Sequence, residues 1–498
     1  MDVLTPGARS APLMDAGTAE RKWLLGLLLL ALAVRVATLG AYPLMDNTEA
    51  RYAEIARKIV ETGEWVTPQF KYGVAFWSKP PLSMWMTAVS YLAFGISEFS
   101  ARLAALVACL PVAWMTYRLA AVRNGTDEGL RATVVLVTTP LFFVCAGAVM
   151  TDPALVFGTA LSMAGFWFAM TLRGVAARAW GYAFFVGLAV GLLAKGPVAA
   201  VLTFAPVGLW ALWKGTIRNV WQRLPWISGL LLTIALSAPW YVLAEQRTPG
   251  FLDYFMIGEH WKRYTESGWK GDMFGTAHKQ TRGIIWPMAL LFTLPWSALW
   301  LIQFKSLRIA AARRGPAPSD DGWVAYLWLW MITPLVFFTF AGNILFTYFL
   351  PGLPAFALLV ARRWSELDFP SRRETMMRYS GLDTPLVIAL LVLFVLPSLA
   401  PVHSHRALVA EYHAQRTSDR EQLLYLHEVP QSAEFYAKGK VTTVEAARDL
   451  APYLADGKRD FFALRDDQLK DVIVERKDLS PVARFGRYTL YVENKGAP

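Results

Sequence analysis

The chain has 498 residues, of which 55% are hydrophobic and only 17% are charged. A soluble protein of this length would carry a larger charged fraction, so the composition indicates an integral membrane protein. The formal net charge of +11 does not indicate nucleic-acid binding, because the basic residues concentrate in short connectors that the positive-inside rule assigns to the cytoplasm. These connectors contain Arg118, Arg123, Arg131, Arg173, Arg178, Lys214, Arg218, Arg223, Lys305, Arg308, Arg313, Arg314, Arg362, Arg363, Arg372 and Arg373.

Apolar runs of the length that a spanning helix needs recur between residues 23 and 402. They predict an α-helical polytopic membrane protein with about 11 to 13 transmembrane helices. The first run is expected to be a retained helix that follows a cytoplasmic tail, residues 1–22, since it ends without a small-residue cleavage site. The expected spans are 23–43, 99–121, 132–150, 154–172, 180–194, 197–213, 225–243, 284–303, 322–340, 349–363 and 383–402, with 82–97 as a shorter candidate.

This topology places the loops 44–80 and 244–283 and the segment 403–498 on the outer face. Loop 44–80 and the turn at Asp152 are both expected there, yet an odd number of apolar segments separates them. Either 82–97 is re-entrant or interfacial, as two prolines before it favour, or a break near Pro111 has been missed.

Residues 403–498 are markedly more polar than the preceding part. Alternating stretches at Leu423–Leu426 and Tyr488–Val492, with helix-like segments near 430–437 and 443–455, predict a small α/β domain. It either caps the outer face or only adds stability.

Carboxylates, cations and aromatic side chains gather in the first outer loop. From Tyr52 on, apolar positions recur at i, i+3, i+4 and i+7, which predicts an amphipathic helix over 49–63 lying on the membrane surface. Asp46 and Glu49 are either functional acids or groups that favour the start of this helix. Lys79 either binds a substrate phosphate or merely extends toward lipid phosphates.

The remaining outer turns add further candidates. Asp152 and Lys195 are each either a turn residue or part of a cavity wall. Tyr348 either reaches a lipid phosphate or is an ordinary interfacial aromatic.

Loop 244–283 interleaves cations and aromatic rings, a pattern that suits a phosphate and a sugar ring. Its main candidates are Glu259, His260 and Arg263. A metal at Glu259 and His260 lacks further ligands, and a metal at the three histidines between 403 and 413 is a similarly weak interpretation.

Three segments carry a family resemblance: Glu49–Ala56, Lys79–Met86 and Glu98–Leu103. They resemble the bacterial polytopic glycosyltransferases that include the lipid A aminoarabinose transferases and, more distantly, the protein O-mannosyltransferases. The resemblance implies a GT-C glycosyltransferase fold in the bacterial inner membrane, with a periplasmic active site and periplasmic C-terminal domain. It also implies an undecaprenyl (polyprenyl) phosphate-linked sugar as donor.

Carried over by position, the resemblance assigns roles to most of the candidates. Arg51, Lys79 and Tyr348 match residues that hold the donor phosphate, and Asp152 matches a second acid of the cavity. His260 and Arg263 line the acceptor and donor side. The substrate cavity is further expected to contain Tyr52, Lys195 and Glu259.

The sequence also departs from the family pattern. Thr48 stands where the aminoarabinose transferases have Asp, Ser78 replaces an acidic residue, and Ile344 replaces a Lys. Either Asp46 or Glu49 then activates the acceptor, or the acceptor is itself a phosphate and needs little activation.

The expected reaction is a single inverting displacement that transfers the sugar to lipid A or a related envelope glycan. No cofactor is required, because the donor carries one phosphate, although the binding of a divalent metal stays open. The partners are membrane lipids and no nucleic acid. A protein O-mannosyltransferase and, in another class, a lipid or sugar transporter or flippase are the alternatives.

Overall fold

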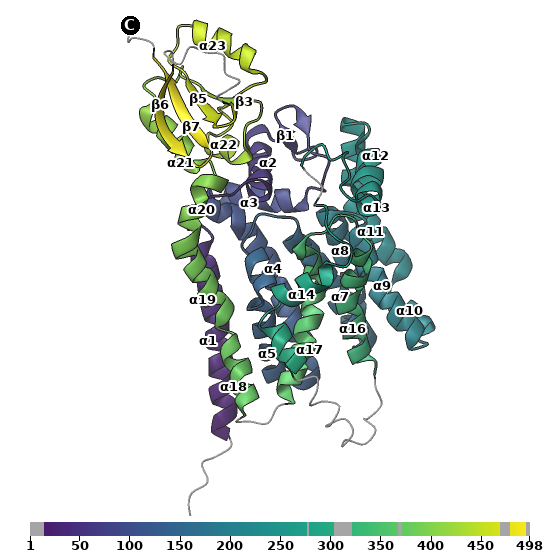
Figure 1. The fold of residues 1–498 in the computed structure, drawn as a ribbon. Coiled ribbons are helices and arrows are strands. Elements are labelled where there is room, and N and C mark those ends of the chain that lie inside the picture. The colour runs from purple at the N-terminus through teal and green to yellow at the C-terminus, as the bar shows by residue number, and fades with distance from the viewer. Residues whose placement is uncertain (1–13, 276–277, 303–320, 367–370, 469–478, 495–498) are drawn as a thin grey trace, which may run out of the picture.

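The computed structural model describes residues 14–275, 278–302, 321–366, 371–468 and 479–494, and most of them form helices that stand side by side (Figure 1). The basic residues predicted between 305 and 314 lie outside these ranges, as does most of the N-terminal tail. The helices are α1 (Met14–Thr38), α2 (Thr48–Thr62), α3 (Leu82–Phe94), α4 (Glu98–Asn124), α5 (Thr126–Val137), α6 (Pro140–Cys145), α7 (Asp152–Thr171), α8 (Gly174–Lys195), α9 (Val198–Trp213), α10 (Ile217–Arg223), α11 (Trp226–Arg247), α12 (Phe251–Asp253), η1 (Tyr254–Lys262), α13 (Arg263–Thr265), α14 (Ile285–Phe292), α16 (Trp323–Thr339), η2 (Phe346–Gly352), α17 (Leu353–Ser365), α18 (Arg372–Ser380), α19 (Asp383–Leu390), η3 (Leu391–Val395) and α20 (Leu396–His403).

Within the described residues, five helices are long and apolar enough to cross a membrane, and six if the pair 285–292 and 296–302, bent by 98°, is one span. Three further apolar helices, α3, α9 and α16, are shorter. The predicted number of spans is larger because several apolar runs are broken. The expected span 132–150, for example, is divided between α5 and α6 at Pro140, which cannot continue the preceding helix.

The structure decides between the two topologies considered for the segment 82–97. Helix α3 has 13 residues, about 20 Å of helix, whereas crossing a bilayer core takes about 30 Å. Helix α4 continues through Pro111 without interruption, as prolines in apolar helices can when neighbouring groups compensate for the lost hydrogen bond. The proposed break near Pro111 is therefore wrong, and the shortness of α3 favours the alternative in which 82–97 does not cross the membrane.

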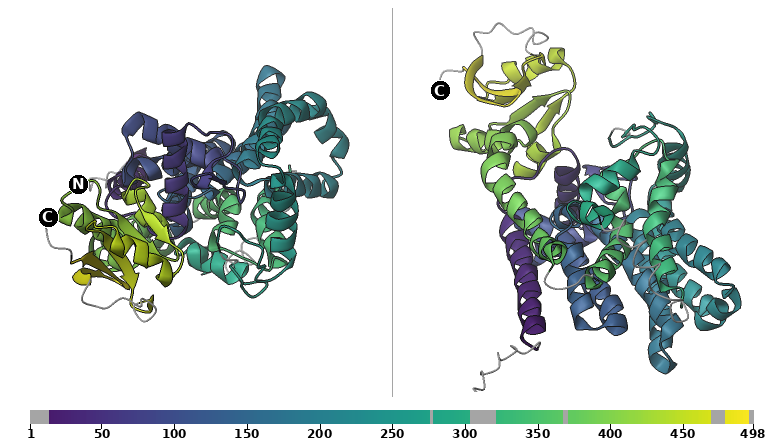
Figure 2. Two further views of the ribbon diagram at one scale, coloured as in Figure 1. Left: turned by 90° about the horizontal axis from the view of Figure 1, so that it is seen from above. Right: turned by 60° about the horizontal axis from the view of Figure 1, so that its bottom comes forward.

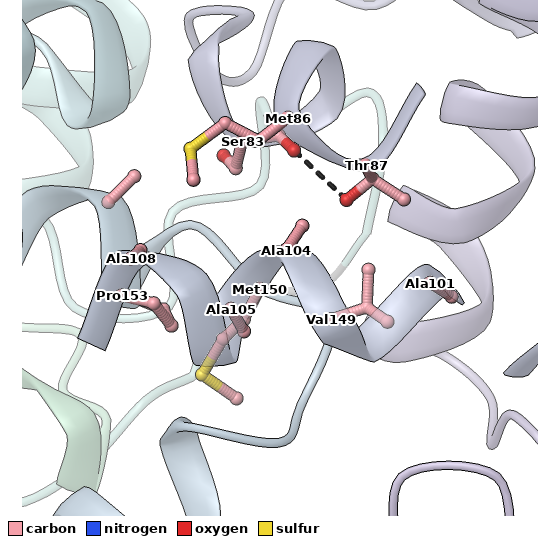
Figure 3. Close-up of a pocket in the computed structure, with 11 residues that line it drawn as sticks. Ser83, Met86, Thr87, Ala101, Ala104, Ala105, Ala108, Val149, Met150 and Pro153 are labelled. Atoms are coloured by element: carbon pink, nitrogen blue, oxygen red, sulfur yellow. Dashed lines mark hydrogen bonds between the residues drawn. The ribbon is translucent and has the colours of Figure 1, made fainter. Parts of the chain in front are cut away.

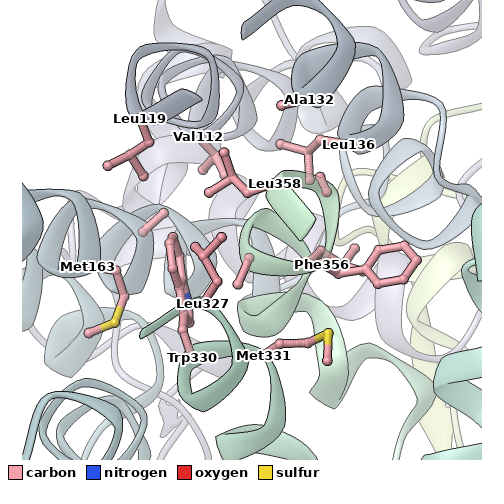
Figure 4. Close-up of a cluster of buried hydrophobic side chains, with 14 of the residues drawn as sticks. Val112, Leu119, Ala132, Leu136, Met163, Leu327, Trp330, Met331, Phe356 and Leu358 are labelled. Carbon is pink, nitrogen blue, oxygen red and sulfur yellow. The ribbon is translucent and has the colours of Figure 1, made fainter. Parts of the chain in front are cut away.

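The helices α4, α5, α7, α16 and α17 pack their apolar faces together in the large core shown in Figure 4. Trp330 is buried there, and its indole N–H donates to the Pro351 carbonyl at 2.9 Å. A buried indole needs such a partner. The contact ties η2, which carries Tyr348, to the core, so the position of this side chain is fixed by the packing of the bundle.

A five-stranded sheet follows the last long helix, with the strand order β4-β3-β5-β7-β6. Strand β3 pairs in parallel with β4 and β5, while β7 is antiparallel to β5 and β6. The strands predicted at 423–426 and 488–492 are confirmed, but the helix predicted over 443–455 begins later because β4 occupies its start. The elements are β3 (Leu423–Leu426), β4 (Thr442–Val444), β5 (Phe461–Arg465), β6 (Leu479–Phe485), β7 (Tyr488–Glu493), α21 (Arg406–Gln415), α22 (Gln431–Tyr436), η4 (Ala447–Leu450) and α23 (Ala451–Ala455).

The C-terminal sheet and α2 lie at the same end of the bundle, and α10 and α18 lie at the opposite end (Figure 1). Seen from above, the sheet lies over the side formed by the N-terminal segments, and the helices of the middle of the chain stand beside it (Figure 2). The polar features singled out in the sequence are therefore collected at one end of the molecule, beneath and beside the C-terminal domain.

Candidate functional site

Helix α2 carries three of the first outer loop's candidates, Glu49, Arg51 and Tyr52. It ends at Gly63, whose positive φ of 71° lets its N–H bond the Ile59 carbonyl and close the helix. The predicted helix is present, but it does not lie on the membrane surface with an open polar face. Its polar face is buried as well, since Glu54 and Lys58 are fully buried. Lys58 forms an ion pair with Glu434 of the C-terminal domain at 2.7 Å.

Glu49 is held by a buried arginine. Arg102 donates to both Glu49 carboxylate oxygens at 2.7 Å. Its remaining N–H groups donate to the carbonyls of Leu39, Tyr42 and Pro43 at 2.7 to 3.0 Å. All five guanidinium donors are thus used, which joins the end of α1 to the start of α2. Glu49 is the anionic half of a structural ion pair.

Asp46 is bound to the C-terminal domain. Its carboxylate accepts hydrogen bonds from the backbone N–H and the hydroxyl of Ser432, at 2.8 and 2.5 Å. Burial raises the pKa of Asp46, and the bonds from Ser432 oppose that rise. Asp46 thus joins two distant segments of the chain, and its predicted role as the acid that activates the acceptor stays a prediction.

Lys79 belongs to a chain of ion pairs that also contains Glu259, Arg263 and Asp272. Its ammonium lies 2.6 Å from the carboxylate of Glu259, which also accepts from Arg263 at 3.1 Å. Arg263 in turn contacts Asp272 at 2.9 Å. Burial opposes the negative charge on Glu259, yet Lys79 and Arg263 together lower its pKa to about 2. Glu259 therefore stays ionised and fixes the two cations in place.

Arg51 differs from the other cations of the site. Among the described residues it makes no ion pair within 4 Å, and its Nε is buried without a hydrogen-bond partner. Its guanidinium lies against Gly275, where an added Cβ would come within 3.2 Å of its terminal nitrogens. A guanidinium held in this way can offer its donors to an anion that enters the cavity.

Asp152 and Lys195 come together although 43 residues separate them. Their side chains form an ion pair at 2.8 Å, and the Lys195 ammonium lies 4.7 Å from the ring centre of Tyr348. His260 is near by, but its two ring nitrogens lie 2.8 and 3.1 Å from the carbonyls of Phe255 and Lys195. The predicted role of His260 in lining the substrate cavity is therefore not supported, since this ring braces two backbone segments.

A cavity of about 1050 Å³ joins these groups to the C-terminal domain. Eight of the eleven predicted site residues line it, namely Asp46, Arg51, Tyr52, Lys79, Asp152, Lys195, Arg263 and Tyr348. Glu49, Glu259 and His260 are not among the described residues that line it. Glu259 contacts the lining residues Lys79 and Arg263, and His260 contacts the Lys195 carbonyl, so both support the cavity wall from behind instead of lining it. The catalytic role of Glu49 stays a prediction.

Several lining residues had not been expected, among them Asp272 of the loop 244–283. His278, one of the interleaved residues of the same loop, also lines the cavity, and burial lowers its pKa. The far wall is supplied by the C-terminal domain, with His427, Arg465 and Arg487 among its polar groups. Arg102 had appeared only as part of a family motif. A spacing of more than fifty residues between Glu49 and Arg102 gives no local signal for their pairing.

The structure offers no obvious metal site within the described residues, where no three His, Cys, Asp or Glu side chains are grouped to hold an ion. His405, one of the histidines considered for this role, is buried, and its Nδ1 lies 3.0 Å from the Tyr425 hydroxyl. Glu259, considered together with its neighbour His260, is already occupied by two cations.

A second pocket lies between α3, α4 and the start of α7 (Figure 3). Its volume of about 10 Å³ holds no more than one water molecule. Thr87 donates to the Ser83 carbonyl at 3.0 Å on one side, and four alanines of α4 face it on the other. The small side chains allow α3 to lie close to α4, which sets the position of Lys79 just before α3.

Comparison with known proteins places these features in a wider context. The family described as dolichyl-phosphate-mannose-protein mannosyltransferase matches residues 23–255. The undecaprenyl phosphate-alpha-4-amino-4-deoxy-L-arabinose arabinosyl transferase 1 of Pseudomonas fluorescens is 28% identical over 405 residues, which are 80% of this chain and 68% of that protein. The corresponding transferase of an Enterobacter species is 30% identical over 363 residues, 71% of this chain and 61% of that protein. The aligned part thus spans about three fifths to two thirds of these relatives.

The structural comparison covers nearly the whole chain. The crystal structure of ArnT from Cupriavidus metallidurans bound to undecaprenyl phosphate superposes with a TM-score of 0.75 at 20% identity, covering 95% of this chain and 98% of that one. The same protein in the apo state gives a TM-score of 0.72. At this level of identity the likeness establishes a shared fold, including the C-terminal sheet.

Proposed function

We propose that this chain, which belongs to the family of ArnT-like GT-C glycosyltransferases, transfers a sugar from a polyprenyl-phosphate donor to an acceptor of the bacterial cell envelope. The observation that carries the proposal is the cationic end of the cavity. There Arg51, without an ion-pair partner among the described residues, stands with Lys79 and Arg263. The relatives named above are arabinosyl transferases that use an undecaprenyl-phosphate sugar, which supports this class of donor.

The donor phosphate is held by the cations of this end. Arg51 offers a planar set of N–H donors, which suits a phosphate, and Lys79 adds a compact charge. Glu259 keeps Lys79 and Arg263 oriented without neutralising the whole group, since it serves two cations. Tyr348 and Lys195 line the same cavity.

The reaction is a single displacement at the anomeric carbon of the donor sugar. The acceptor oxygen forms the new bond to this carbon as the bond from the carbon to the phosphate oxygen breaks. The leaving phosphate keeps the bonding electron pair, and preorganised cations stabilise the charge that develops on it. Attack from the face opposite the phosphate inverts the configuration, and no sugar–enzyme intermediate forms.

The carboxylates of the cavity bear on the nature of the acceptor. Asp46 is bonded to Ser432, Asp152 to Lys195, and Asp272 to Arg263. Each of these carboxylates therefore already has a hydrogen-bond or ion-pair partner within the protein. The arrangement favours an acceptor group that is already ionised, such as the phosphate of lipid A or a related envelope glycan, over a hydroxyl that must lose a proton.

The proposed location is the bacterial inner membrane, with the cavity and C-terminal domain on the periplasmic side. The basic connectors support this orientation, because α10 and α18 lie at the end opposite the C-terminal domain (Figure 1). The cavity is large enough for a lipid headgroup and a sugar together, and it is bounded by both the helical bundle and the C-terminal domain. No metal is assigned to the reaction, because side-chain cations bind the single phosphate of the donor and balance its charge.

A second candidate is transfer of a mannosyl group to protein, which the match to the protein mannosyltransferase family over residues 23–255 supports. A transporter or flippase is less favoured, since its binding groups would lie near the middle of the bundle. Here the charged groups lie at one end.

The test is mass spectrometry of lipid A, other envelope glycans and periplasmic proteins from cells with and without the gene. Lipid A or an envelope glycan that loses a sugar-sized mass in the deletion strain would support the proposal. An unchanged glycan profile with a loss of mannose from proteins would favour the second candidate.

A further inference from the structure

Helix α22 of the C-terminal domain contacts the segments that carry the donor-site residues. Ser432 donates from its backbone N–H and its hydroxyl to the Asp46 carboxylate, at 2.8 and 2.5 Å. Glu434, two residues further on, pairs with Lys58 at 2.7 Å. Both contacts join parts of the chain that are more than 370 residues apart, so one short helix reaches the loop before α2 and the helix itself.

Tyr436, at the end of α22, makes a third connection. Its hydroxyl accepts from the backbone N–H of Leu44 at 2.8 Å and donates to Glu98 at 3.0 Å. Glu98 also pairs with Arg406 of the C-terminal domain at 3.2 Å. The start of α4 and the loop before α2 are therefore both bonded to the same domain.

These contacts lie on both sides of Arg51 along the chain. Asp46 precedes Arg51 by five residues, and Lys58 follows it by seven, which is about 10 Å along a helix. Arg51 makes no ion pair of its own among the described residues. Its position in the cavity therefore follows from the position of the α2 backbone, which Asp46 and Lys58 connect to α22.

The contacts are shielded from water. The Lys58 side chain is fully buried, and its ammonium also donates to the Phe70 carbonyl at 2.7 Å. Ser432 is fully buried as well. Charged hydrogen bonds in such surroundings are strong, and water does not readily replace a lost partner.

The C-terminal domain does not depend on these side chains for its own core. That core consists of apolar residues such as Tyr425, Ala433 and Phe461. The Glu434 side chain points instead to α2. The Ser432 hydroxyl donates to Asp46 in the loop before α2, and it also accepts from the backbone N–H of His405 in its own domain at 2.9 Å. Their placement serves the junction between the two parts of the molecule.

We propose that α22 is a positioning element for the phosphate subsite, in which Ser432 acts through Asp46 and Glu434 acts through Lys58 to hold Arg51 in the cavity. Neither Ser432 nor Glu434 is expected to touch the ligand. The inference rests on the proposed function, because it identifies the cavity end at Arg51 as the place where the lipid phosphate binds.

The test measures the affinity of the full-length protein for undecaprenyl phosphate in lipid nanodiscs, with intrinsic tryptophan fluorescence as the signal. Glu434→Gln and Ser432→Ala are each compared with the wild type and with Arg51→Ala. Asp419→Asn is the matched control, since this acid of the same domain has a side chain that is 93% exposed. Thermal unfolding of every variant is recorded, and Ser432→Ala, which removes no charge, keeps the test informative if Glu434→Gln lowers stability.

Each α22 variant is expected to weaken binding by about tenfold, the size typical of coupling through intervening residues, with no effect of Asp419→Asn. In the Arg51→Ala background, Glu434→Gln is expected to cause no further loss, because the positioned group is already absent. Unchanged affinity in both α22 variants, or an equal loss with and without Arg51, would overturn the inference. A wild-type protein that does not bind undecaprenyl phosphate would instead overturn the proposed function.

Discussion

Replacing Glu49 with Gln tests whether the Glu49 carboxylate has a structural or a catalytic role. Arg102 is fully buried and places two of its five donors on the Glu49 carboxylate, both at 2.7 Å. Breaking a buried ion pair by removing one partner costs about 3–5 kcal/mol. We expect the lower end, about 3 kcal/mol, because Gln retains one oxygen that accepts from Arg102 and the remaining three donors keep their carbonyl partners.

The assay combines thermal unfolding in detergent with turnover per folded molecule. Glu49→Gln is expected to lower the unfolding temperature by several degrees, while turnover of the folded fraction stays within a small factor of wild type. Glu61→Gln on the same helix is the control, since the Glu61 side chain is 47% exposed and its ion pair contributes little, about 0–1 kcal/mol. A Glu49→Gln protein with wild-type stability and no turnover would refute the structural role and make Glu49 the catalytic acid.

Three further outcomes follow from the charged groups of the site. Lys79→Met is expected to reduce turnover by about 10²–10³-fold, the usual cost of losing one donor to a developing charge, whereas Lys79→Arg retains most of it in a steady-state assay with the lipid donor. Because the pKa of Glu259 is about 2, below the value of about 4.3 for an unfolded chain, its stabilising contribution is present above about pH 4.3 and is lost as the pH falls toward 2. Thermal unfolding as a function of pH should therefore be flatter over this interval for Glu259→Gln than for wild type, and parallel curves would contradict the assignment. Treatment with EDTA is expected to leave turnover unchanged, and a loss restored by a divalent cation would show that a metal takes part.

Much of the fold could be predicted because the apolar pattern is strong and local. The helix that carries Arg51 follows from the spacing of Tyr52, Ile55 and Ile59, all of which are buried. The strand at Leu423–Leu426 is likewise recognisable, since all of its residues are apolar and buried. The breaks in apolar runs were harder to predict, because a run of apolar residues does not reveal whether its helix is interrupted, as it is between α5 and α6.

The site was only partly predictable for a related reason. The cations Arg51, Lys79 and Arg263 were identified because they lie in outer loops and in family motifs, and all three line the cavity. The pairing of Glu49 with Arg102 and of Asp46 with Ser432 depends on tertiary packing, over 53 and 386 residues respectively. From the sequence, both acids could be either functional groups or groups that favour the start of α2, whereas the structure shows each of them bonded to a distant partner.

The central claim is tested most directly by reconstituting the purified protein in proteoliposomes with a synthetic undecaprenyl-phosphate aminosugar, labelled in the sugar, and lipid A as acceptor. Chromatography and mass spectrometry then follow both lipids over time. The account predicts that undecaprenyl phosphate is released in a one-to-one ratio with glycosylated acceptor, and that Arg51→Ala abolishes both. Movement of the intact lipid-linked sugar across the bilayer, with no bond cleaved, would contradict it.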